Sequence, residues 1–194
     1  MGIREEQTIR EQGGDPADQA GRPLAAPLPA SAAPPVPPRP APGRSGYAGH
    51  LDRLAAAAGT PAEADAVAAV LSDPDPVMAD SAVVTHLDRR AVRLPADAAF
   101  SGWAGALRPA VAGRPFPARR LREWTLLKAM QAGGPWSADE LVAASDWCQH
   151  AAALSPAPYE ALVVLAARAR TGRARNAAAQ RLRRLALPKD PCAR

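Results

Sequence analysis

Cysteine is nearly absent from this sequence, and its scarcity removes several kinds of site. Cys148 and Cys192 are the only two, and they do not stand with histidines at the spacing of a zinc site. Two distant cysteines cannot form a disulfide framework, so a reducing compartment, the cytoplasm, is expected. The motifs of phosphate-binding loops, dinucleotide-binding folds, metalloproteases and serine hydrolases are missing as well. We therefore expect no catalytic, cofactor-binding or metal-binding residues and no small-molecule substrate, and we predict that the protein is not an enzyme.

Long apolar stretches and aromatic residues are also scarce. No run approaches the ~18 apolar residues of a membrane-spanning helix, and the first twelve residues lack the apolar segment of a signal peptide. Phe, Tyr and Trp make up 4% of the chain, although hydrophobic residues reach 47%. The core must then consist mainly of Ala, Leu and Val, which suits close-packed helices because Ala has the highest helix propensity. A β-sandwich, which prefers β-branched and aromatic residues, is disfavoured.

Alanine, arginine and proline are abundant instead. Ala supplies about a quarter of the chain and Arg almost all of its 24 basic residues, an enrichment typical of bacteria with GC-rich genomes. Residues 1–44 hold ten of the 22 prolines and show no helical or strand period, which predicts a disordered tail. Within this tail, PPVPPRP (34–40) matches the PxxPxR pattern of SH3 ligands, although a simple tether is the less demanding interpretation. Residues 189–194 are predicted to form a short C-terminal tail.

From residue 45 to residue 188 the apolar residues follow the period of an α-helix. Eight consecutive helices joined by short loops are expected, and no strand. The apolar face of the fourth helix is predicted to consist of Phe100, Trp103, Ala104, Leu107 and Val111. A single sixth helix is predicted to carry Leu141, Ala144, Cys148 and Ala152, and the seventh to carry Tyr159, Leu162, Val163, Ala166 and Ala169. Gly59, the DPDP turn (73–76), RPFP (114–117), Gly133-Gly134 and Gly172 are the expected breaks. The sequence therefore predicts an all-α domain.

Local patterns predict how several of these helices begin. Thr60 to Glu63 and Ser137 to Glu140 read as capping boxes, in which Ser or Thr binds a backbone N–H. Asp75 is expected to cap the third helix. Pro109 is expected to kink or split the fourth helix, and Pro117 to open the fifth.

Two segments resemble the short HEAT-like repeats of bacteria. SDPDPVMADSAVV (72–84) is similar to the turn and second-helix start that this family writes as D-x-D-P-x-V-R, with Met78 in place of the arginine. ARNAAAQRL (174–182) is similar to the second-helix core VR-x-AAA-x-x-L, with Arg175 and Leu182 at the positions of the family's Arg and Leu.

The spacing and surroundings of the two segments bear on the same resemblance. Val77 and Ala174 are separated by nearly three repeats of about 32 residues. Thr171-Gly172 stands where the family has Asp-Pro, and the two intervening units carry no motif. The resemblance implies a right-handed solenoid of helical hairpins whose concave face binds a partner. An irregular helical bundle is the alternative.

The last helix is rich in arginine. TGRARNAAAQRLRRL (171–185) carries five arginines and no acidic residue, and its apolar residues share one arc of the helix. Such a surface can attract phosphates, but a terminal repeat also needs a polar outer face, and aromatic residues that stack on bases are missing. A solvated face, or one that binds an acidic protein, is favoured, and nucleic-acid binding is the alternative. The candidate residues in the last two helices are Arg168, Arg170, Arg173, Arg175, Arg183 and Arg184.

A second basic cluster, Arg119, Arg120 and Arg122, lies in the first turn of the fifth helix. Positive charge there opposes the helix dipole, which a functional anion site could justify. Pairing with Glu123 is the simpler interpretation.

Other polar and aromatic residues have structural interpretations. Asp146 and His150 are four residues apart and are expected to hydrogen-bond. Asp80 falls among apolar positions, so we expect it to be partly buried and bonded to an arginine or a backbone amide. The tryptophans are expected to be the bulky members of a small-residue core. The sequence as a whole predicts a non-catalytic helical-repeat protein that binds another protein, with nucleic-acid binding as the alternative.

Overall fold

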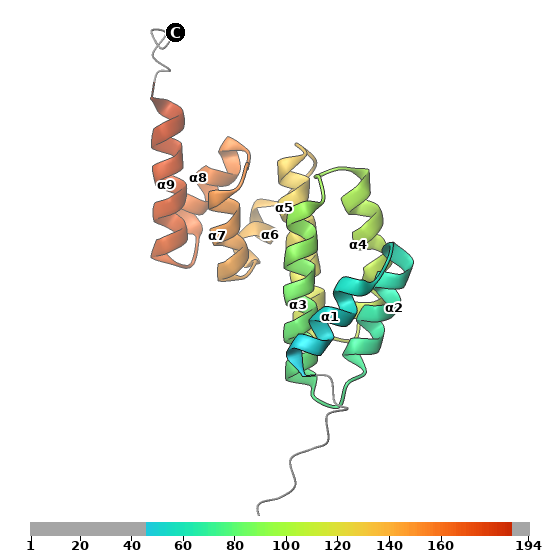
Figure 1. The fold of residues 1–194 in the computed structure, drawn as a ribbon. Coiled ribbons are helices and arrows are strands. Elements are labelled where there is room, and N and C mark those ends of the chain that lie inside the picture. The colour runs from blue at the N-terminus through green and yellow to red at the C-terminus, as the bar shows by residue number, and fades with distance from the viewer. Residues whose placement is uncertain (1–45, 188–194) are drawn as a thin grey trace, which may run out of the picture. The chain divides into compact units, whose positions relative to one another are not determined.

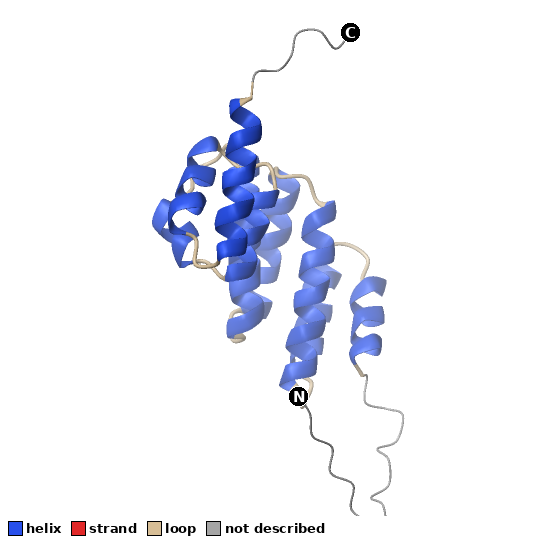
Figure 2. Cartoon of the chain, turned by 90° about the vertical axis from the view of Figure 1, so that its left-hand side faces the viewer, coloured by secondary structure: helices blue, strands red, loops and turns tan. Residues whose placement is uncertain are grey.

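Helices account for all the regular structure that the computed structural model describes, which covers residues 46–187 (Figure 2). The expected absence of strands is confirmed in this range, but the chain forms nine helices there rather than eight. Both predicted tails, the PxxPxR segment and Cys192 lie outside the described residues. The helices are α1 (Tyr47–Ala56), α2 (Thr60–Leu71), α3 (Pro76–Arg93), α4 (Ala98–Val111), α5 (Pro115–Gln131), α6 (Ala138–Ala143), α7 (Asp146–Leu154), α8 (Tyr159–Arg168) and α9 (Gly172–Ala186).

Short polar side chains cap the N-termini of most of these helices. Asp75 accepts a hydrogen bond from the backbone N–H of Met78 at 3.0 Å, with Pro76 as the first helical residue, as predicted. Asp97 and Ser137 cap α4 and α6 in the same way. Each cap satisfies a backbone donor that the helix leaves unpaired.

The ninth helix arises because the segment predicted as one long helix is divided in two. Ala144 ends α6, and Ser145 caps α7 by accepting a hydrogen bond from the backbone N–H of Cys148 at 3.3 Å. The buried Glu123 of α5 accepts the backbone N–H of Ser145 at 2.9 Å. Gln149 donates to the carbonyls of Leu141 and Val142 at the end of α6. Tertiary hydrogen bonds therefore stabilise a break that the local pattern does not show.

Three predicted helix boundaries need correction. The N-cap of α2 is Gly59, with φ of 85°, and Thr60 is already helical. Pro115 rather than Pro117 opens α5, because Arg114 is the extended residue before the helix. Pro109 does not split α4, since it lies close to the end of the helix.

The helices pack as two rows of stacked hairpins (Figure 1). In the first row α1, α3, α5, α7 and α9 follow one another, and each contacts the next. In the second row α2 packs against α4 and α6 packs against α8, but no comparable contact joins α4 to α6. The described residues thus have the contact pattern of a hairpin stack with one interruption in its second row.

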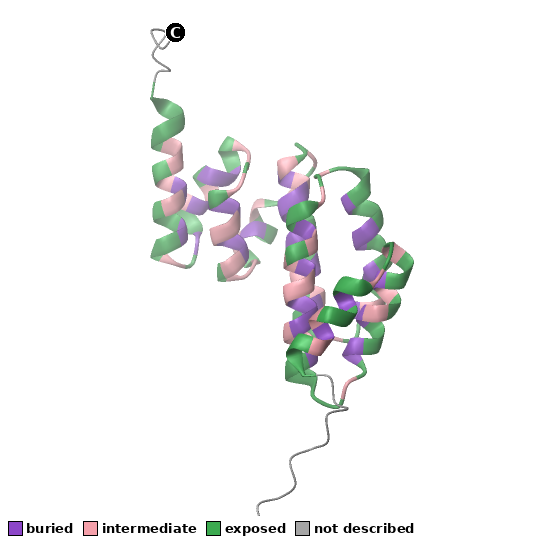
Figure 3. Ribbon diagram, in the orientation of Figure 1, coloured by how far each residue is buried: buried purple, intermediate pink, exposed green. Residues whose placement is uncertain are grey.

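One continuous apolar core runs through both rows (Figure 3). The predicted stripe of α4 is buried in full, namely Phe100, Trp103, Ala104, Leu107 and Val111. The predicted stripe of α8 is only partly right: Leu162 is buried, as is Leu165, whereas Tyr159 and Val163 face solvent. Ala174 and Ala178 are the buried residues of α9, which has neighbours on one side only.

An aromatic and charged cluster joins the helices of the first row. Asp88 of α3 accepts a hydrogen bond from the indole of Trp124 of α5 at 2.7 Å. Arg120 of α5 stacks on the ring of Trp147 of α7 at 3.5 Å, and the Trp124 and Trp147 rings meet edge to face at 5.4 Å. The cluster therefore connects three successive helices.

Replacing Trp147 with alanine tests the importance of this cluster. The variant loses the stacking partner of Arg120 and the edge contact of Trp124, so we expect its free energy of unfolding to fall by about 2 kcal/mol. Urea denaturation of the full chain measures the change. Tyr159→Ala is the control: Tyr159 is 58% exposed, and its loss should cost less than about 0.5 kcal/mol. Equal stability of the two variants would contradict the assignment.

Candidate functional site

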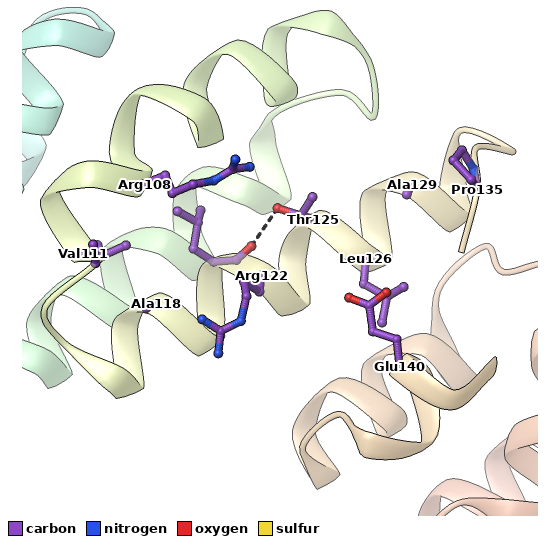
Figure 4. A pocket seen from close by; sticks show the side chains of 11 residues that line it. Arg108, Val111, Ala118, Arg122, Thr125, Leu126, Ala129, Pro135 and Glu140 are labelled. Carbon is purple, nitrogen blue, oxygen red and sulfur yellow. Dashed lines mark hydrogen bonds between the residues drawn. The ribbon is translucent and has the colours of Figure 1, made fainter. Parts of the chain in front are cut away.

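A large hollow lies between α4, α5 and α6 (Figure 4). Its volume is about 570 Å³, within the range of ligand-binding clefts. The floor is formed by apolar residues of α4 and α5, including Val111, Leu121 and Leu126. Figure 4 shows Glu140 of α6 beside Leu126, with Arg122 about one turn away along α5.

This hollow lies at the interruption of the second row. α4 covers one side of α5, but the short α6 contacts chiefly α7 and α8. α6 ends at Ala143, because Ala144 is already extended and Gln149 binds the carbonyls of Leu141 and Val142. The surface of α5 that a longer second-row helix would cover is therefore left open.

Two smaller hollows continue the opening along α5. One, of about 200 Å³, shares Arg122, Leu126 and Glu140 with the large hollow. The other, also about 200 Å³, shares Thr125 and Ala129 with it. The lining of the three hollows extends along the chain from Arg119 to Ala132, and we call the three together the α5 groove.

The α5 groove is lined by four basic residues, Arg108, Arg119, Arg122 and Lys128, and by three acidic ones, Asp97, Glu123 and Glu140. Arg108 and Arg122 are exposed, and neither has an ion-pair partner among the described residues. Lys128 is buried and donates to the carbonyl of Leu94 at 2.6 Å, and burial lowers the pKa of its amine. Glu140 is the acidic residue of the central hollow.

The structure separates the three arginines predicted as a cluster on α5. Arg120 is turned inward onto Trp147 and lies 3.7 Å from Asp88. Arg119 lies 5.7 Å from the ring of Phe116, and it lines the α5 groove together with Arg122. The expected pairing with Glu123 is wrong, because the Glu123 carboxylate accepts the backbone N–H of Ser145.

Three of the six arginines predicted in α8 and α9 make contacts within the chain. Arg168 reaches Asp139 at 3.4 Å and Arg170 reaches Asp146 at 3.1 Å. Arg175 donates to the carbonyl of Ala169 at 2.6 Å. The other three are exposed and have no partner within the described part of the chain: Arg173, Arg183 and Arg184.

The pairing of Asp146 with Arg170 also bears on the predicted bond between Asp146 and His150. No such bond forms between these two side chains, and the Nδ1 atom of His150 is buried without a hydrogen-bond partner in the described structure. The prediction for Asp80 is confirmed: its carboxylate is largely buried and accepts a 2.8 Å hydrogen bond from Arg114.

The most buried ionic group on α2 was missed by the sequence analysis. Glu63, read there as part of a capping box, is 4% exposed. Its Oε1 atom accepts hydrogen bonds from His86 at 2.7 Å and from the indole of Trp103 at 2.8 Å, and its Oε2 atom lies 3.4 Å from Arg90. His86 and Arg90 are four residues apart on α3, a spacing that puts them on one face and is the signal that could have revealed the network.

Residues 46–187 contain no group of His, Cys, Asp and Glu side chains that could hold a metal ion, and none of their helices is long and apolar enough to cross a bilayer. Comparison of the chain with protein-family models, with curated proteins and with solved structures gave no match.

The Glu63 network should give stability a measurable pH dependence. Burial alone would raise the pKa of Glu63, but hydrogen bonds from His86 and Trp103 and the charges of His86 and Arg90 outweigh it and lower the pKa below the ordinary 4.5. A carboxyl with a lowered folded-state pKa stabilises the fold above its unfolded pKa, and this contribution is lost as the pH falls through the folded value. We expect Glu63→Gln to lose about 2 kcal/mol at pH 7 and to lack this part of the acid dependence.

Urea denaturation across a pH series measures the effect. Glu160→Gln is the matched control, because Glu160 is exposed and has no partner among the described side chains. Parallel pH profiles for the wild type and Glu63→Gln would show that the network does not contribute.

Cys148 is expected to be inert as a nucleophile. Its thiol is fully buried, and burial together with the charge of Glu123 raises its pKa to about 12. In a Cys192→Ser background, a thiol reagent at pH 8 should label the native protein only as fast as it unfolds. Rapid, complete labelling without denaturant would contradict the burial.

Proposed function

We propose that this protein is a non-catalytic helical-repeat module of the bacterial cytoplasm that binds a partner protein by accepting one of its amphipathic helices in the α5 groove. The proposal rests on one observation, the interruption of the second row of helices beside α5. In a hairpin stack each unit packs against the next one. Beside α5 the second row lacks this packing, because α2 contacts α4 and α6 contacts α8 but no comparable contact joins α4 to α6.

The dimensions of the groove favour a helical ligand. The stretch of α5 between Arg119 and Ala132 is about 20 Å long at 1.5 Å per residue, which matches a helix of three to four turns. The small side chains of Ala118 and Ala129 along the groove allow a second helix to approach closely. An added helix would place its apolar face on these residues, as in other helix-in-groove complexes.

Charge indicates which residues should flank the apolar face of that helix. Arg108 and Arg122 line the central hollow and have no ion-pair partner among the described residues, and Arg119 lies at one end of the α5 groove. Carboxylates on the partner helix would pair with these guanidinium groups, which sets the orientation and rate of binding more than its strength. The partner is therefore proposed to carry Asp or Glu beside its apolar face.

Photo-crosslinking of the full chain tests this proposal. Thr125 is an exposed groove residue on α5, and a photoreactive amino acid there should crosslink one partner through a segment with helical apolar periodicity and acidic flanks. The same amino acid at the exposed Ala167 of α8 is the matched control and should not capture that partner. A synthetic peptide of the captured segment should then bind the purified protein.

Charge reversal separates this function from nucleic-acid binding. Arg108→Glu combined with Arg122→Glu should weaken peptide binding by about tenfold or more, since each free guanidinium loses an acidic partner and gains a repulsion. Arg183→Glu combined with Arg184→Glu makes the same charge change on α9 and should have little effect. Loss of binding only in the α9 variant, or nuclease-sensitive binding, would replace the proposal with the nucleic-acid alternative. Absence of any crosslink specific to Thr125 would show it to be wrong.

A further inference from the structure

A second hollow, remote in sequence from the α5 groove, lies between α1, α2 and α3. Its volume is about 270 Å³. One wall is aliphatic and comes from α1 and the residue after it: Leu51, Leu54, Ala55 and Ala57. The opposite wall comes from α2 and α3: Glu63, His86, Arg89, Arg90 and Arg93.

The polar wall is built by helical spacing on α3. His86, Arg89, Arg90 and Arg93 occupy positions i, i+3, i+4 and i+7, which lie along one face of a helix. α3 packs against α1, so this face is held opposite the aliphatic wall. Both walls thus come from packed helices rather than from loops.

Glu63, the acidic residue of the hollow, does not neutralise the positive charge of the arginines that line it. Both carboxylate oxygens of Glu63 are already engaged, by His86 and Trp103 on one side and by Arg90 on the other. Arg89 and Arg93 have no partner within residues 46–187. Three guanidinium groups therefore face one carboxylate, and two of them remain free to bind an anion.

We propose that this hollow is a binding site for a small oxyanion, a carboxylate or phosphate group joined to a short aliphatic chain. The planar guanidinium groups of Arg89 and Arg93 bind the oxyanion, since arginine pairs with both groups through two parallel hydrogen bonds. The aliphatic chain lies against Leu51 and Leu54. Glu63 holds His86 and Arg90 in place and is a positioning residue.

Two kinds of ligand carry these groups: a free aliphatic acid, and a protein whose C-terminal carboxylate follows an aliphatic residue. Titrations of the full chain with hexanoate, with inorganic phosphate, and with a short peptide ending in Leu, free or amidated, distinguish them. The indole N–H signal of Trp103 in nitrogen-15 NMR spectra is the readout, because this group donates to Glu63 at 2.8 Å. Trp103→Phe assigns the signal.

We expect saturable shifts of the Trp103 signal with hexanoate, with the free peptide, or with both. Shifts with hexanoate alone identify a small-molecule site, and shifts with the free but not the amidated peptide identify a protein C-terminus. Saturation by inorganic phosphate alone would overturn the proposal, because the aliphatic wall would then have no role. The absence of saturable shifts with all the probes would overturn it as well.

Paired variants show whether binding occurs in this hollow. Ala55→Glu places a carboxylate in the hollow and should weaken binding by about tenfold or more, through repulsion of the anion and pairing with the arginines. Ala56→Glu is the matched control, since Ala56 is the next residue of α1, equally exposed, and does not line the hollow.

A second pair of variants tests the arginines. Arg89→Ala combined with Arg93→Ala should weaken binding by about tenfold or more, because charge-assisted hydrogen bonds are lost. Arg183→Ala combined with Arg184→Ala removes the same charge from α9 and should change affinity by less than about twofold, since exposed charges beyond a Debye length are screened. Equal effects in a variant and its control would show general attraction to a basic surface and overturn the site.

Discussion

The break between α6 and α7 is the constraint on which the α5 groove depends. It exists because buried polar side chains satisfy the backbone groups that two helix ends expose. Glu123 accepts the N–H of Ser145, and Gln149 donates to the carbonyls of Leu141 and Val142. An unsatisfied buried backbone group costs about as much as a lost hydrogen bond, and these contacts remove that cost at the two helix ends. A continuous helix would leave the Glu123 carboxylate buried without this partner.

Buried polar contacts of this kind give specific packing to a core made of small side chains. Alanine allows helices to approach closely, but a surface of alanines offers few distinct features to fix how one helix sits on the next. In this protein, ionic and aromatic contacts fix how the helices pack on one another. Glu63 of α2 bonds to side chains of α3 and α4, and Arg120 of α5 stacks on Trp147 of α7. Arginines also donate to backbone carbonyls of segments distant in the sequence, as Arg114 does to Leu71 and Pro76. Much of the arginine enrichment therefore serves internal connections.

The sequence predicted the fold class, the starts of α3 and α6 and the buried face of α4, because each depends on residues a few positions apart. The sequence-based prediction failed where contacts between residues far apart in the sequence determine the structure. Thr60 to Glu63 has the local pattern of a capping box, yet the Glu63 side chain binds partners on α3 and α4 instead. Ser145 looks like an interior residue of a long helix until Glu123 is placed beside it. The arginines predicted as one patch were separated for the same reason, since a helical wheel shows direction but not the neighbour that lies there.

The α5 groove combines an apolar floor with free charge, and this combination constrains how it can bind. Leu121 and Leu126 are already buried in the free protein, so a docking helix removes little additional apolar surface of theirs from water. Most of the gain must come from the partner's own apolar face, at about 25 cal/mol for each Å² that it buries. Arg108 and Arg122 are exposed, so their contribution weakens with salt and acts mainly on the rate of association and on the choice of partner. The partner helix that we propose would thus bind reversibly and be selected by charge rather than assemble permanently.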